Sequence, residues 1–286
     1  LCVIVLLMGT TGFGELDSLF IGPYYISHQK DATDAYGSIY NLEEGSVTYR
    51  IFLDLAEGYK LLNINGTPDL PLILESSEGI FNNIDRGGLY GYEVRADRLD
   101  RNTTALDSWI SLGFASNSHK GILKIYDDDG SIIGGENNNG GSENIPGGLL
   151  SNNDPDAGIP LLSADGLTEG TFNPNDFLTD GLSDTSIFGS TFKKEFQSGN
   201  FYLSSNTGIP GTGPEHHILI DHMTTKGDIS FKINIAVEDS LGKTLQIKYD
   251  DVNLNDGDLV SKWLSYPFRS GCTDPNFVEY DPLAVY

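Results

Sequence analysis

The side chains best suited to acid–base or metal chemistry in this chain gather around three histidines. His216 and His217 are adjacent, and Asp221 and His222 follow shortly after them. In a β-strand successive side chains face opposite sides, so His216 and His222 would share one face and Asp221 would share the other with His217. Two histidines on one face could ligate a metal or assist a base, but no cysteine or acid at zinc-like spacing reinforces them. We therefore expect a structural or surface role for these residues.

Other catalytic patterns are weak in the sequence. No serine stands in a G-x-S-x-G turn, and the glycine pairs at 87–88 and 140–141 lack the lysine of a phosphate-binding loop. The two carboxylates of a glycoside hydrolase are close in space and not in sequence, so 41 acidic residues leave that activity open. Whether the chain is an enzyme stays undecided, with the balance toward a non-catalytic protein.

Residues 127–190 are rich in Asp, Asn and Gly, which supply oxygen ligands and bend the backbone. Calcium takes about six to eight oxygens from carboxylates, amides and carbonyls, so Ca²⁺ is the cofactor that we expect. The candidate ligands here are Asp127, Asp129, Asp154 and Asp156. Residues 251–258 approach an EF-hand loop but place Gly257 one position late. Each cluster alone is more often a solvated turn than a metal site.

The net charge restricts the partners. The chain has 17 basic and 41 acidic residues and a formal charge of -24, which repels nucleic acid and anionic membrane surfaces. Such an excess suits a calcium-containing or saline medium, although plain solubility explains it equally well. We expect a polysaccharide or cell-surface partner and no nucleic acid.

The first fourteen residues have the order of a secretory signal peptide. Residues 1–8 are an apolar run, and small residues follow as far as Gly14, with a cleavage position near Gly14 and Glu15. The run is too short for a membrane span, which needs about 20 residues, so we expect no membrane insertion. A short buried strand or helix is the alternative. The pattern favours an extracellular or outer cell-surface location.

Cysteine usage fits export. Cys2 lies inside the predicted signal, which leaves Cys272 as the single cysteine of the mature chain. A lone cysteine in an exported protein favours a disulfide, and we expect its partner beyond Tyr286. A free surface thiol or an intermolecular bridge is the alternative.

The hydrophobic pattern predicts strands and no sustained helix. Segments of alternating β-branched or aromatic and polar residues, separated by turn signals, favour an all-β fold, an antiparallel β-sandwich or jelly-roll-like, with long acidic Gly/Asn/Asp loops. The expected strands are 47–55, 59–64, 70–74, 89–96, 109–115, 121–126, 201–204, 217–223, 229–237 and 245–249. Trp109 is expected in the core, whereas Trp263, near Tyr266 and Phe268, fits either the core or an exposed platform for sugar stacking.

The expected organisation has five parts. They are a signal remnant at 1–14, a connecting segment at 15–44, a β-sandwich domain at 45–250 with the loop-rich insertion 127–190, a linker at 251–270, and a terminal Cys/Asp module at 271–286.

The terminal module carries a resemblance. It is similar to a short motif of secreted Bacteroidota proteins, G-C-T-D-P-x-A-x-N-Y-[DN]-P-x-A followed by an acidic turn and D-G-S-C. Phe277 and Glu279 replace the usual Ala and Asn. The matching residues are Gly271, Cys272, Thr273, Asp274, Pro275, Tyr280, Asp281, Pro282 and Ala284. The resemblance implies a disulfide that closes a small loop, with Asp274 and Asp281 as ligands of a calcium-like ion.

The blocks at 49–55, 107–113 and 217–231 resemble surface-protein domains of the same bacteria, which are often exported by type IX secretion. This resemblance implies a non-catalytic β-domain of a larger secreted protein, with further domains in the same polypeptide and a structural, adhesive or carbohydrate-binding role. The alternative function is an ancillary or catalytic part of a secreted hydrolase that acts on polysaccharide or protein.

Overall fold

The computed structural model describes residues 16–27, 42–83, 86–93, 106–112, 177–179, 193–196, 200–203, 208–210, 217–268, 271–272 and 274–276. The regular elements that they form are strands, apart from two single-turn 3₁₀ helices, η2 (Gly91–Glu93) and η9 (Lys262–Leu264). The fold is all-β and sandwich-like, as the sequence predicts. In the part of the chain that is described, no helix has the length and apolar character of a membrane span.

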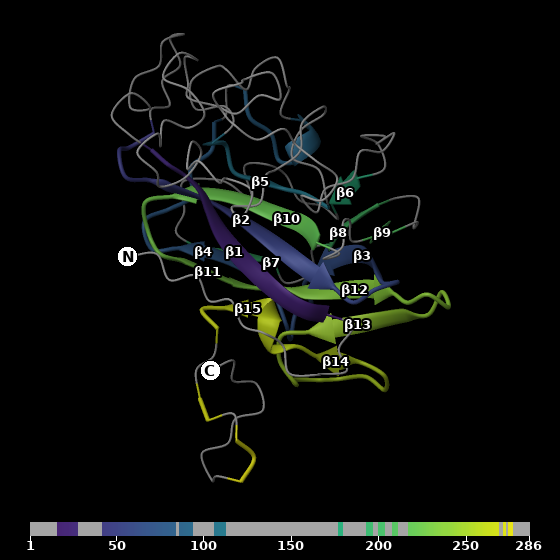
Figure 1. Ribbon diagram of the computed structural model, residues 1–286. Coiled ribbons are helices and arrows are strands. Elements are labelled where there is room, and N and C mark those ends of the chain that lie inside the picture. The colour runs from purple at the N-terminus through teal and green to yellow at the C-terminus, as the bar shows by residue number, and fades with distance from the viewer. Residues whose placement is uncertain are drawn as a thin grey trace.

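The first layer is a four-stranded antiparallel sheet of order β1-β2-β10-β5. Its strands are β1 (Leu16–Ile26), β2 (Val47–Leu55), β10 (His217–Thr225) and β5 (Trp109–Ile110). β1, β2 and β10 lie side by side in Figure 1. β1 falls in the segment 15–44 that the sequence indicates as a connection, yet it forms one of the two outer strands of this sheet.

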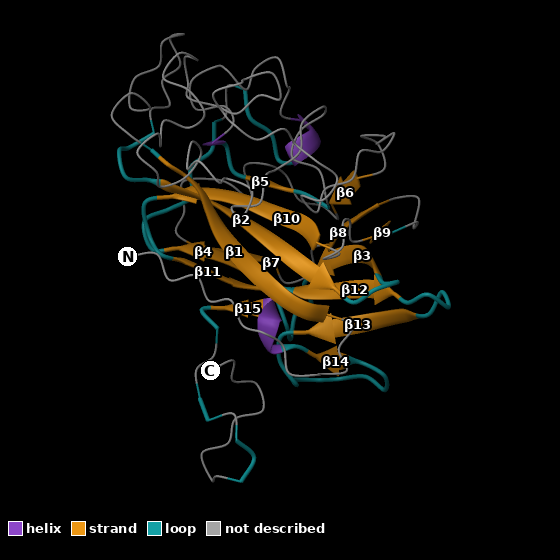
Figure 2. Cartoon of the chain, viewed as in Figure 1, coloured by secondary structure: helices purple, strands orange, loops and turns teal. Residues whose placement is uncertain are grey.

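The second layer contains two further sheets (Figure 2). The four-stranded sheet has the order β15-β11-β4-β7, and the seven-stranded sheet has the order β14-β13-β12-β3-β8-β6, with β9 paired to β3. The strands of the first are β4 (Leu72–Ser76), β7 (Lys193–Phe196), β11 (Ile229–Lys232) and β15 (Ser265–Tyr266). The strands of the second are β3 (Lys60–Asn65), β6 (Phe177–Thr179), β8 (Asn200–Leu203), β9 (Ile209–Pro210), β12 (Asn234–Glu238), β13 (Thr244–Lys248) and β14 (Leu259–Val260).

A continuous hydrophobic core lies between the layers. Leu53 and Ile218 of the first layer and Leu61, Phe231 and Ile235 of the second are at most 1% exposed and belong to one cluster of buried side chains. β11 and β12 follow one another with only Ile233 between them, so one run of chain serves both sheets of the second layer. The alternating apolar residues of these strands therefore meet in a single core, as the sandwich pattern requires.

The regular pleat of the first layer is interrupted in β10. Leu219 pairs with Phe52 and Asp221 with Ile51, so Ile220 is an extra residue without a partner in β2. This β-bulge shifts the alternation of side chains by one residue over the second half of β10. It decides which face of the sheet Asp221 and His222 occupy.

Candidate functional site

A row of polar and aromatic side chains crosses the first layer at His222. His222 pairs with Arg50 of β2 on one side and with Trp109 of β5 on the other. Arg50 Nε donates a hydrogen bond to His222 Nδ1 at 3.2 Å, and the Trp109 and His222 rings stack with their centroids 4.4 Å apart. Because Nδ1 accepts this bond, the imidazole carries its proton on Nε2 there.

These three side chains lie in the interior. Arg50 is 5% exposed, Trp109 2% and His222 0%. The expected burial of Trp109 is thereby confirmed, on the face of the first layer that His222 occupies. A substrate in solution does not reach a histidine that is fully covered and stacked on a tryptophan, so the arrangement positions strands and loops.

Hydroxyl groups continue the polar row along β10. The Thr48 and Thr224 hydroxyls are 2.7 Å apart across the β2–β10 pair, and Ser108 Oγ accepts a hydrogen bond from the Thr224 amide at 2.9 Å. Thr225 and Ser76 form a similar contact of 2.6 Å between the two layers. All five side chains are buried, so these bonds satisfy groups that water does not reach.

Asp107 holds the loop that precedes η2. Its carboxylate accepts hydrogen bonds from the Asn83 amide at 2.6 Å and from the Gly88 amide at 2.8 Å, and the residue is 0% exposed. A side chain at Gly87 would collide with this carboxylate, which explains the glycine. The Asp107 carboxylate thus binds the backbone amides of this turn as a bound anion would. The glycine pair 87–88 alone does not reveal this role.

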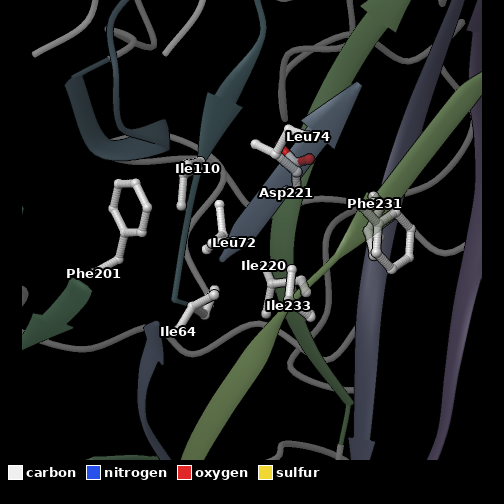
Figure 3. A pocket seen from close by; sticks show the side chains of 10 residues that line it. Ile64, Leu72, Leu74, Ile110, Phe201, Ile220, Asp221, Phe231 and Ile233 are labelled. Atoms are coloured by element: carbon white, nitrogen blue, oxygen red, sulfur yellow. The ribbon is translucent and has the colours of Figure 1, made fainter. Parts of the chain in front are cut away.

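Asp221 lies on the opposite face of the sheet from His222 and points into the core. Its register partners are Ile51 and Ile110, and all three line a cavity of about 20 Å³, roughly the size of one water molecule. Figure 3 shows the carboxyl group among apolar side chains from both layers. Neither of its oxygens has a hydrogen-bond partner among the described residues.

The bulge corrects the sequence-based expectation about Asp221. Strict alternation from His217 would place Asp221 on the face opposite Ile218. In the structure Ile218 pairs with Leu53 and Asp221 with Ile51, which are alternate residues of β2 and therefore share a face. The prediction failed because the extra residue Ile220 reverses the alternation. His216 lies outside the described residues.

Of the predicted calcium ligands, the structure describes Asp274 alone. Asp274 is exposed, and its Oδ1 accepts hydrogen bonds from the Asn276 amide at 2.9 Å and from Asn276 Nδ2 at 2.7 Å, which forms a compact turn. Asp127, Asp129, Asp154, Asp156 and Asp281 lie outside the described residues. The described residues contain no cluster of three or more potential metal ligands.

Cys272 has a free thiol at the start of this turn. Its sulfur lies 3.7 Å from the Asp274 carbonyl oxygen, and the residue is half-buried.

The EF-hand-like loop 251–258 contains a lysine ammonium at its neck. Lys248 Nζ lies 2.7 Å from Asp258 Oδ2 and donates a hydrogen bond to the Asn253 carbonyl at 3.3 Å. Burial alone would raise the pKa of Asp258, but the hydrogen bonds from Lys248 and Asn255, together with the lysine charge, lower it. The lysine ammonium thus neutralises the Asp258 carboxylate in this loop.

Trp263 belongs to a partly exposed aromatic cluster near the C-terminal end. Its ring meets Phe268 edge to face with centroids 5.3 Å apart, and Phe268 meets Tyr266 in the same way at 5.4 Å. Tyr266 stacks on the buried Phe231 at 5.7 Å. The cluster therefore extends from the core to the surface, and Trp263, Tyr266 and Phe268 are all half-buried.

The comparisons with known proteins return no family: no family model, no curated protein and no solved structure matches this chain.

Proposed function

We propose that this chain is a non-catalytic extracellular β-domain of a larger secreted protein, with a binding role toward carbohydrate at the cell surface. The observation that supports the proposal is the placement of its reactive side chains. Arg50, Asp107, Asp221 and His222 are all at most 5% exposed. Arg50 donates a hydrogen bond to His222, and Asp107 accepts hydrogen bonds from two backbone amides. Both side chains therefore stabilise the fold.

The cluster of Trp263, Tyr266 and Phe268 supplies the surface for this role. Aromatic rings offer a large apolar face for stacking on sugars, and these three reach the surface while anchored to Phe231. Lys262 Nζ lies 5.5 Å from the centre of the Trp263 ring, which adds a donor for sugar hydroxyls beside the stacking face.

The test combines a binding and a hydrolysis assay on the same polysaccharides. We expect the protein to migrate more slowly in a native gel when a polysaccharide that it binds is embedded in that gel. The Trp263→Ala variant should migrate as it does in a gel without polysaccharide. Leu241→Ala is the matched control, because Leu241 is a large apolar residue that is 90% exposed elsewhere on the surface. Release of reducing ends by the wild-type protein would instead favour a secreted hydrolase.

A further inference from the structure

Among the described residues that line the cavity between the layers, Asp221 alone is ionisable. Its two register partners in the first layer, Ile51 and Ile110, line the cavity together with Leu72, Leu74 and Phe231 of the second layer. Ile220, Ile64, Ile233 and Phe201 complete the lining. Asp221 is 4% exposed, so water does not solvate its carboxyl group from outside.

No described residue that lines this cavity, from β2, β3, β4, β5, β8, β10 or β11, carries a charge to offset an ionised carboxylate. Charged residues that are adjacent to the lining residues in sequence point to the opposite face of their strand, away from the cavity. These charged residues are Arg50 beside Ile51, Glu75 beside Leu74 and Lys232 beside Phe231. An isolated carboxylate in such surroundings has a large desolvation cost, and the neutral acid avoids it.

The protonation of Asp221 follows the same physics. Burial raises the pKa of Asp221 to about 8, and the nearby backbone amide of His222 opposes this shift only in part. The amide does not complete a hydrogen bond to the carboxyl group. At neutral pH the folded chain therefore holds Asp221 mainly as the neutral acid, whereas the unfolded chain exposes it as a carboxylate.

We propose that Asp221 is a built-in pH sensor of the sandwich: the core accepts it only as the neutral acid, so its contribution to stability is greatest in acid and declines as the pH rises through neutrality. A neutral carboxyl group inside the β-bulge permits close packing of β10 on β4 and β11. An ionised one places an uncompensated charge between the layers.

The direction and the pH window follow from the linkage of proton binding to folding. Between pH 3.8 and about 8 the folded chain retains a proton that the unfolded chain has lost. Each pH unit in this window then raises the equilibrium constant of unfolding about tenfold through this group. Below pH 3.8 Asp221 is protonated in both the folded and the unfolded chain, and above about pH 8 it is ionised in both. Its contribution to the free energy of unfolding is therefore constant outside this window.

The decisive experiment measures urea unfolding from pH 3 to pH 10 for the wild-type chain, Asp221→Asn and Asp221→Leu. Both variants remove the ionisation and keep a side chain of similar size. Asp251→Asn is the control, because Asp251 is an exposed carboxylate in a loop. We expect the wild-type stability to fall relative to both Asp221 variants between about pH 4 and 8, and the control to run parallel to the wild type. Parallel curves for wild type and Asp221→Leu would overturn the proposal.

An infrared measurement on the wild-type chain does not depend on whether a variant folds. A protonated carboxyl group has a carbonyl stretch separate from the carboxylate bands. We expect this band in the folded chain at pH 6 and its loss as the pH passes through about 8. Its absence at pH 6 would show that Asp221 is ionised in the core and would contradict the proposal; where Asp221→Asn folds, absence of the band in that variant assigns it.

Discussion

Asp107 Oδ2 accepts a hydrogen bond from the Gly88 amide across 19 residues of sequence, at 2.8 Å, while its Oδ1 accepts one from the Asn83 amide. One buried carboxylate therefore fixes both ends of a turn that would otherwise expose two backbone donors to an apolar interior. The strand that follows, β5, pairs with β10, so this turn is tied directly to the central strand of the first layer.

Removal of the Asp107 carboxylate should destabilise the fold. We expect Asp107→Ala to lose about 2 to 4 kcal/mol of the free energy of unfolding, because it leaves buried amides without their charged acceptor. Urea denaturation followed by circular dichroism measures this loss. Asp251→Asn is again the exposed control, and equal stability of Asp107→Ala and wild type would contradict the structural role.

Gly87 provides an independent test of the same turn. A Cβ atom at this position would meet the Asp107 carboxylate at a distance that no real contact allows. We therefore expect Gly87→Ala to be destabilising by about 1 to 3 kcal/mol, within the range of overpacked interiors. In the double variant Gly87→Ala/Asp107→Ala the penalty of the methyl group should largely disappear. Simple additivity of the two changes would show that the residues do not touch.

The imidazole of His222 should stabilise the fold in two ways, through stacking of its ring and through the hydrogen bond that its Nδ1 accepts. His222→Phe keeps a ring that can stack on Trp109 but removes the acceptor for Arg50 Nε, whereas His222→Ala removes both contacts. We expect losses of about 1 to 3 kcal/mol for the phenylalanine variant and about 3 to 5 kcal/mol for the alanine variant. Thermal and urea unfolding provide the comparison. A reversed order would contradict the stacked arrangement.

The Lys248–Asp258 pair should make stability depend on pH in the acidic range. Since the pKa of Asp258 is lowered in the folded chain, its contribution is present above the unfolded value, 3.8, and is lost as the pH falls through the folded value. We expect Lys248→Met to lose about 1 kcal/mol at pH 7 and progressively less as the pH is lowered below 3.8. Lys243→Met, at an exposed position of the β12–β13 hairpin, should show no such pH dependence.

The proposed calcium stabilisation can be checked directly. A ligand that binds only the folded chain raises its melting temperature, so a chelator should lower the midpoint if Ca²⁺ is held by the acidic loops or by Asp274 and Asp281. Differential scanning calorimetry with EDTA and with added CaCl₂ makes the comparison, and MgCl₂ controls for ionic strength. An unchanged midpoint would contradict a structural ion.

The sequence predicts most of the longer strands because their apolar and polar residues alternate cleanly, but the strand expected at 89–96 is wrong, since Gly91–Glu93 form η2. The segments expected at 47–55, 217–223 and 245–249 correspond to β2, β10 and β13, whose bounds differ by at most two residues. The sequence predicts one strand over 229–237, but the chain changes sheets at Ile233, which separates β11 from β12. Apolar and polar residues alternate without a break from Ile229 to Ile235, so the sequence carries no sign of this change.

The surroundings of the polar residues were harder to predict. A β-bulge reverses the faces of Asp221 and His222, and nothing in the local residue types marks Ile220 as the extra residue. The partners of His222 come from residues 50 and 109, far away in sequence, so only the three-dimensional pairing brings them together. Asp107 could have been suspected from its position before an apolar strand, but its acceptor role depends on a turn nineteen residues earlier.

The pairing of β2 with β10 also has a consequence for how fast the chain folds. The Arg50–His222 contact joins residues 172 apart in sequence, and the Thr48–Thr224 contact joins residues 176 apart. Loops of this length close slowly, and folding rates fall as native contacts become more distant along the chain. The first layer therefore cannot be completed until β10 has been synthesised, long after β1 and β2.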